Sequence, residues 1–163
     1  MKLAALALAS ATLGAPTSVD HGAPAPVVAA AAEARPFGSV DSAAVNVATA
    51  LVLARTNGHR VILVFGANWC HDSRALAGWF ATPRFAAMLR DRYEVVWINV
   101  GDEPGEKDRN GALARDFGLD GIKGTPTVLM LDSMGKPTNL ADAPRWNNAA
   151  SRTQDSIYDY FAR

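Results

Sequence analysis

The sequence predicts an α/β sandwich with a mixed β-sheet flanked by helices, and three observations predict it. Helical spacing of apolar residues alternates with short β-branched apolar runs along most of the chain. The last of these runs precedes a hairpin turn, which adds an antiparallel neighbour to an otherwise alternating order. The chain has 163 residues, 49% of them hydrophobic, which is enough for one domain with its own core.

The first half of the chain supplies a helix and a buried strand. Apolar residues recur at three- and four-residue steps over residues 39–56, where Ser39 or Asp41 can cap the start and Gly58 ends the helix. Residues 61–65 form a continuous apolar run, which is typical of a strand covered by helices on both faces.

Two helices and a second strand are expected next. The helical pattern resumes over residues 70–80, and Thr82 and Pro83 suit the N-cap and first position of a further helix that extends to residue 92. Residues 95–100 then form a second apolar β-type run.

The remaining elements are shorter. We expect, in order, a polar loop over 101–110, a short helix over 112–117, a strand over 127–131, a hairpin turn over 133–136, a weak strand over 137–140, an irregular stretch over 142–148, and a last helix over 151–161 that buries Ile157, Tyr160 and Phe161.

The N-terminus has the plan of a secretory signal peptide. In residues 1–15, Lys2 precedes an apolar stretch that ends in small residues, and cleavage is expected between residues 15 and 30. The apolar stretch is shorter than the roughly 20 residues of a membrane-spanning helix, so we expect no stable membrane insertion after cleavage and a periplasmic or secreted protein. Residues 16–38 are rich in Ala and Pro and are expected to form a flexible lead-in, which leaves the domain in 39–163.

Charge and cysteine content exclude several classes of protein. The 16 basic residues balance 16 acidic ones, so the chain has no basic excess for nucleic acid. Because Cys70 is the single cysteine, an intramolecular disulfide is excluded, and a structural zinc site built on several thiolates is not expected. The sequence contains no phosphate-binding glycine loop either, and we expect no cofactor and no metal.

Cys70 is the main candidate for chemistry. It lies where a predicted buried strand gives way to a helix, and the free N–H groups and positive end of a helix favour a thiolate over a thiol. Ser73 lies one turn further on and can offer its hydroxyl to the sulfur, while a protonated His71 would favour the thiolate and Asp72 would oppose it. The competing interpretation is that Cys70 is simply a small buried apolar residue, but the polar residues beside it favour exposure.

A second element lies directly before a predicted strand, where Gly124, Thr125, Pro126 and Thr127 follow one another. Proline is tolerated at the first position of a strand, so this spacing alone says little.

Taken together, the two elements resemble the thioredoxin-like superfamily over roughly the whole domain. The strand that leads into Trp69 and Cys70, and the segment that leads into Thr125 and Pro126, carry the resemblance. It implies a three-layer thioredoxin-like sandwich in which Cys70 is the attacking cysteine. It also implies that Trp69 is the aromatic residue before that cysteine, and that Thr125 and Pro126 form a cis-proline loop that receives the substrate chain.

The sequence departs from the pattern of the family at several positions. Ser73 stands where the resolving cysteine would be, so the motif is Cys-x-x-Ser and the ordinary dithiol cycle is closed to this chain alone. His71 and Asp72 replace the Gly-Pro pair between the cysteines, and Val64 stands where the family has a buried carboxylate.

Three functions follow as alternatives. The first is monothiol exchange in the cell envelope, in which Cys70 forms mixed disulfides with protein or small-molecule partners and an external thiol resolves them. Under this function the catalytic residues are Cys70 and Ser73, and the substrate-binding residues are Trp69, His71, Asp72, Thr125 and Pro126. The second is a redox-inactive module that binds extended peptides or partner proteins. The third, metal handling by Cys70, His71 and either Asp72 or His59, has few ligands.

Overall fold

The computed structural model describes residues 31–163, and its central sheet has three strands in the order β2-β1-β3. β1 (Arg60–Gly66) pairs in parallel with β2 (Tyr93–Asn99) and antiparallel with β3 (Thr127–Leu131). The expected mixed sheet is therefore confirmed. Six of the seven residues of β1 are buried, as a strand between two helical layers requires.

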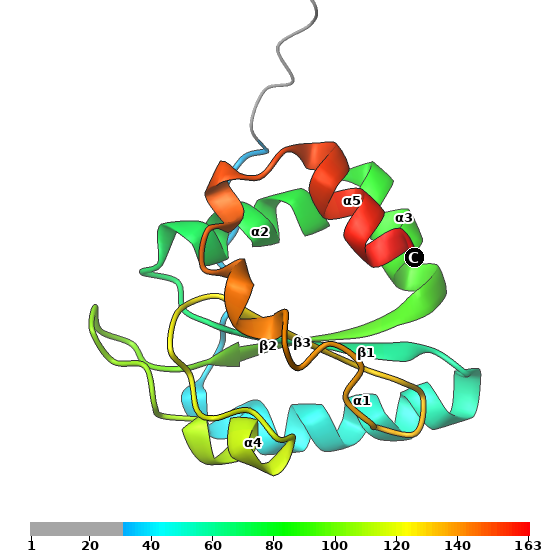
Figure 1. Cartoon of the computed structure of the whole chain (residues 1–163), viewed down its shortest axis with the longest axis horizontal. Coiled ribbons are helices and arrows are strands. Elements are labelled where there is room, and N and C mark those ends of the chain that lie inside the picture. The colour runs from blue at the N-terminus through cyan, green and yellow to red at the C-terminus, as the bar shows by residue number, and fades with distance from the viewer. Residues whose placement is uncertain (1–30) are drawn as a thin grey trace, which may run out of the picture.

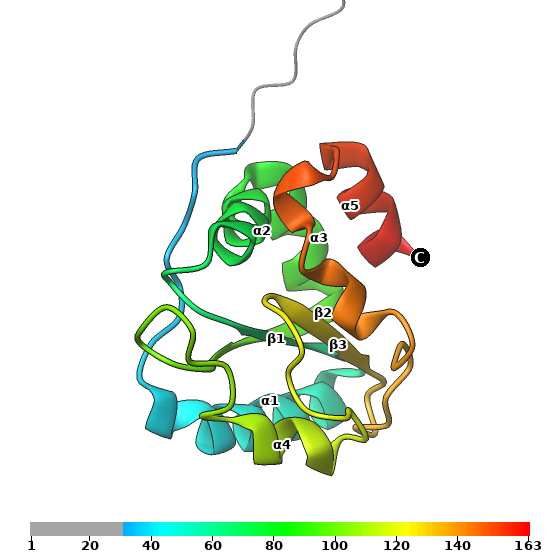
Figure 2. The same cartoon turned by 60° about the vertical axis from the view of Figure 1, so that its left-hand side comes forward.

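Helices cover both faces of the sheet and complete three layers (Figures 1 and 2). The helices α1 (Ala43–Asn57) and α4 (Gly111–Asp116) lie on one face. The other face carries α2 (His71–Ala81), α3 (Pro83–Arg92) and α5 (Gln154–Ala162). The short 3-10 helices are η1 (Val40–Ser42), η2 (Ala143–Trp146) and η3 (Ala149–Ser151).

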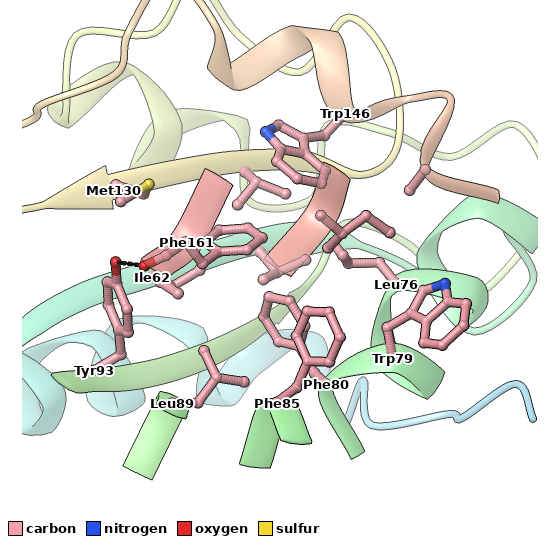
Figure 3. Close-up of a cluster of buried hydrophobic side chains, with 14 of the residues drawn as sticks. Ile62, Leu76, Trp79, Phe80, Phe85, Leu89, Tyr93, Met130, Trp146 and Phe161 are labelled. Atoms are coloured by element: carbon pink, nitrogen blue, oxygen red, sulfur yellow. Dashed lines mark hydrogen bonds between the residues drawn. The ribbon is translucent and has the colours of Figure 1, made fainter. Parts of the chain in front are cut away.

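Alternation along the strands divides the core in two. Ile62 and Val64 face the α2, α3 and α5 side, whereas Val61, Leu63 and Phe65 face the α1 and α4 side. The first side is rich in aromatic rings, and Phe80, Phe85, Trp146 and Phe161 pack there beneath the helices (Figure 3).

Helix boundaries follow the predicted signals closely. Ser39 caps η1 by accepting a hydrogen bond from the backbone of Asp41. Gly58 ends α1 with a φ of 79°, a left-handed conformation that glycine adopts without strain. Pro83 opens α3 after Thr82, as expected.

The structure differs from the prediction mainly after β3. Residues 137–140 form no strand, and the hairpin is closed by a single bridge between Leu131 and Pro137. The side chain of Asn139 takes the place of a backbone partner, because it accepts from the Met130 N–H (2.7 Å) and donates to the Val128 carbonyl (3.0 Å). Residues 142–148 contain η2. Tyr160 is only partly buried, and its hydroxyl accepts a hydrogen bond from Asn139.

The domain also begins earlier than expected. Residues 16–30 of the expected lead-in, and the expected signal peptide, lie outside the described residues. Residues 31–37, however, pack along α2, and we call them the strap (Figure 2). Phe37 is 4% exposed and joins the aromatic core, which explains why the chain is held here despite its Ala- and Pro-rich composition. Within residues 31–163, no helix combines the length and the apolar character needed to cross a membrane.

Candidate active site

Cys70 lies at the junction that the sequence predicts. β1 ends at Gly66, a short turn follows, and Cys70 is the N-cap of α2 with an extended backbone (φ −82°, ψ 122°). Its side chain is partly exposed and free of any disulfide. The site therefore combines an accessible thiol with the N-terminus of an eleven-residue helix.

The second element meets the first in space. The Cys70 thiol donates to the Thr125 carbonyl at 3.3 Å, although the two residues are 55 positions apart. The Thr125–Pro126 peptide bond is cis, and the chain then enters β3. Because β1 and β3 pair antiparallel, the end of β1 lies beside the start of β3, which brings the thiol and this loop to the same end of the sheet.

Trp69 is fixed by the loop that follows β2. Its indole N–H donates to the Gly101 carbonyl at 3.0 Å, and its ring packs against the core on the α1 side. Trp69 is partly exposed and directly precedes Cys70 in the chain.

His71 and Asp72 both have partners other than the Cys70 thiol. His71 is largely exposed, and its Nδ1 lies 2.5 Å from Glu33 Oε1. The Asp72 carboxylate accepts from the Ala150 N–H at 2.8 Å and so ties α2 to η3. In this structure Asp72 thus has a structural contact that the sequence did not indicate.

Ser73 behaves differently from its expected role. Its side chain is fully buried, and its hydroxyl is without a hydrogen-bond partner among the described residues, so it does not offer a hydrogen bond to the Cys70 sulfur. The reason is the direction of the side chain: an added Cβ on Gly66 would lie 2.6 Å from Ser73 Oγ and 2.7 Å from the Phe37 ring. Ser73 therefore faces the core at the end of β1, while Cys70 faces the Thr125 loop.

Sequence reasoning missed Glu33 and Arg74. Glu33 Oε2 accepts from Arg74 Nε at 2.5 Å, and the Arg74 guanidinium also donates to the carbonyls of Asn68 and Trp69. The hydrogen bond from Arg74 lowers the pKa of the Glu33 carboxyl, against a smaller opposing effect of burial. The signal that could have found this cluster is the charged pair Glu33 and Arg35 inside an otherwise apolar stretch.

The residues named for metal binding are not brought together. His59 contacts Glu94 at 3.1 Å. His59 directly precedes β1, whereas Cys70 follows the other end of that strand, so the two residues are far apart. Across residues 31–163, His, Cys, Asp and Glu side chains form no group of three that could hold an ion.

Comparison with known proteins decides the family. The family profile described as thioredoxin-like matches residues 43–133, which include both Cys70 and the cis-proline loop. The chain belongs to the thioredoxin-like family. The expected family and the three-layer thioredoxin-like fold are thereby confirmed.

A solved structure extends the likeness beyond the matched residues. The thioredoxin-like chain is similar to the disulphide isomerase from Xylella fastidiosa Temecula1, with 32% sequence identity and a TM-score of 0.68. The match covers 79% of this chain and 95% of that one. Comparison with curated proteins gives no match.

Proposed function

We propose that this thioredoxin-like protein carries out monothiol thiol–disulfide exchange through Cys70. The observation that carries the proposal is the partly exposed Cys70 thiol at the start of α2, in contact with the Thr125 carbonyl. The family and the similarity to a disulphide isomerase support the same chemistry. The partners are protein or small-molecule thiols and disulfides. The substrate-binding residues are Trp69, His71 and Asp72, which lie near Cys70 in the chain, and Thr125 and Pro126 of the cis-proline loop.

The exchange takes place in two substitutions at sulfur. The Cys70 thiolate attacks one sulfur of a partner disulfide, a new S–S bond forms, and the partner's other sulfur leaves as a thiolate. The thiolate of an external thiol then attacks the mixed disulfide and releases the Cys70 thiolate. Ser73 cannot perform this second step, because a hydroxyl does not displace a thiol from a mixed disulfide.

The first experiment traps the mixed disulfide. The chain without residues 1–30 would be incubated with a peptide that contains one disulfide, and the intact mass would be recorded before and after addition of glutathione. We expect a Cys70-dependent adduct that glutathione removes, and no adduct with Cys70→Ser. If excess disulfide gives no adduct while the peptide still binds, and Cys70→Ser binds it equally, the redox-inactive binding module replaces our proposal.

Restoring the second thiol tests the role of the serine. We expect Ser73→Cys to gain catalytic reduction of insulin disulfides, since the new thiol lies one helical turn from Cys70. Ser73→Ala is the matched control and should show no gain. No activity in Ser73→Cys would mean that the surroundings of Cys70, and not only the missing thiol, prevent turnover.

We also propose that the protein acts in the cell envelope after removal of a signal peptide in residues 1–15. The charged and apolar order of these residues supports the proposal. N-terminal sequencing of protein recovered from a periplasmic extract should start between residues 16 and 31. Recovery of the intact N-terminus from the cytoplasm would contradict it.

A further inference from the structure

The strap approaches the active-site helix closely along its length. The Ala34 N–H donates to the Arg74 carbonyl at 3.1 Å. The Phe37 backbone exchanges two hydrogen bonds with the Asn68 side chain, at 3.2 and 2.7 Å. The strap therefore contacts Asn68, two positions before Cys70, and Arg74, four positions after it, so it is bound on both sides of the active-site cysteine.

Glu33 is the residue of the strap that contacts the Cys-x-x-Ser segment itself. Its two carboxylate oxygens have different partners, each at 2.5 Å: Oε2 accepts from Arg74 Nε, and Oε1 lies on His71 Nδ1. The Arg74 side chain is only 16% exposed, whereas that of His71 is 68% exposed. One oxygen thus has a largely buried partner, and the other contacts an imidazole that makes no further hydrogen bond among residues 31–163.

Arg74 is itself held on the opposite side. It donates to the Trp69 carbonyl at 2.8 Å and to the Asn68 carbonyl at 3.1 Å, and Arg35 also donates to the Asn68 carbonyl. The guanidinium therefore bridges the Glu33 carboxylate and the turn that precedes Cys70. Charge-assisted hydrogen bonds of this kind fix geometry more strongly than neutral ones.

We propose that Glu33 is a positioning residue for His71, and that through His71 it sets the reactivity of Cys70. This inference rests on the proposed function, since it assigns His71 a part in the reaction of the adjacent thiol. A carboxylate on Nδ1 orients the imidazole ring and complements its positive charge when it is protonated, and a positive ring next to Cys70 favours the attacking thiolate.

The other charged groups near His71 do not compete for its Nδ1. Asp72 accepts from the Ala150 N–H, and Arg74 is bound to Glu33. His71 also lines a cleft of about 640 Å³ with Arg152 and Asp155. Arg152 donates to Asn148 and to the Arg145 carbonyl, and Asp155 pairs with Arg84. Glu33 is therefore the acidic partner of His71 in this region.

A double-mutant cycle read by alkylation tests the inference. The rate of Cys70 alkylation by iodoacetamide would be measured in the chain that starts at Ala31, for the wild type, E33Q, H71Q and E33Q/H71Q. The pH range is about 5 to 8, where an imidazole changes charge. We expect E33Q to lower the rate about threefold or more near neutral pH, and the second substitution to add little in the H71Q background.

E103Q is the matched control, because it removes one exposed carboxylate from the loop beside Trp69 and that carboxylate makes no hydrogen bond or ion pair among residues 31–163. Its profile should follow the wild type. A purely structural effect of E33Q would persist in the H71Q background and would overturn the inference, as would an unchanged rate in E33Q. Normal alkylation with no disulfide adduct would refute the proposed function alone, and a wild-type thiol that resists alkylation would refute both.

Discussion

Ser73 carries a hydroxyl in an environment that gives it no partner. The side chain is fully buried between α2 and the end of β1, and its oxygen is unpaired within the described part of the chain. A buried polar group without a hydrogen bond costs about 1–3 kcal/mol. The position therefore suits a less polar atom better than an oxygen.

We predict that Ser73→Ala stabilises the protein. The substitution removes the unpaired hydroxyl at the cost of a very small cavity, so the free energy of unfolding should rise by about 1 kcal/mol. Urea unfolding followed by circular dichroism measures this change, with Ser156→Ala as control, since Ser156 is exposed and its hydroxyl donates to the Thr153 carbonyl. A marked loss of stability in Ser73→Ala would show that the hydroxyl has a partner in solution.

At the scale of elements, two close approaches depend on single residues. Gly78 in α2 lies against the strap, and an added Cβ would be 2.2 Å from the Ala32 carbonyl oxygen. Asn139 closes the outer edge of β3 with its side chain, where a backbone strand was expected. The missing side chain of Gly78 thus allows the strap to pack on α2, and the side chain of Asn139 holds the segment after the hairpin turn against β3.

Gly78→Ala should release the strap while leaving α2 intact. Glycine to alanine in a helix ordinarily stabilises by about 1 kcal/mol, but here the new Cβ overlaps the backbone of Ala32. We expect the Ala34 amide to exchange hydrogen at least about tenfold faster, while the amides of α2 keep their protection. Gly38→Ala is the control, because the space around Gly38 is open. Equal protection at Ala34 in both variants would show that the strap tolerates the extra carbon.

Asn139→Ala should destabilise the β3 edge. It leaves the Met130 N–H and the Val128 carbonyl without their partners, and we expect a loss of about 1–3 kcal/mol in the free energy of unfolding. Asn46→Ala removes an exposed amide whose hydrogen bond to Ser42 is long, so it should change stability by less than about 0.5 kcal/mol. Similar urea midpoints for the two variants would contradict the role given to Asn139.

At the scale of the whole molecule, polar side chains of β1, β2 and the end of α3 hold the C-terminal helix. The Tyr93 hydroxyl donates to the Phe161 carbonyl at 2.6 Å (Figure 3), Arg92 to the Ala162 carbonyl and Arg60 to that of Arg163. These donors satisfy carbonyls at the end of α5 that have no partner within the helix. The pKa of Tyr93 is raised by its burial, which outweighs the lowering effect of Arg60 and Arg92.

This attachment predicts a loss of stability in alkali. The folded state favours the protonated Tyr93 phenol. The contribution of this phenol to the free energy of unfolding is therefore complete below the ordinary tyrosine pKa, near pH 10, and is lost as the pH rises through the raised pKa. Tyr93→Phe should be about 1 kcal/mol less stable at neutral pH, and its stability should fall less between pH 9 and about 11 than that of the wild type. Parallel pH profiles of the two proteins in urea unfolding would contradict this prediction.

The fold could be predicted largely from the sequence because its signals are local. Buried strands appear as apolar runs, and Ser39, Gly58 and Pro83 mark helix ends through their own backbone and side-chain chemistry. The edge of β3 and the strap could not be predicted in this way. Asn139 and Glu33 act through partners that are distant in the sequence, so no periodicity reports them.

The sequence by itself determined that one thiol stands at the start of a helix after a buried strand, that no second thiol can resolve it, and that a proline precedes the third strand. Only the tertiary structure decided which groups surround that thiol. It placed the Thr125 carbonyl on the sulfur, turned the Ser73 hydroxyl toward the core, and brought Glu33 to His71. The physical reason is that chain connectivity sets spacing along one element, whereas contacts between elements depend on how sheet and helices pack.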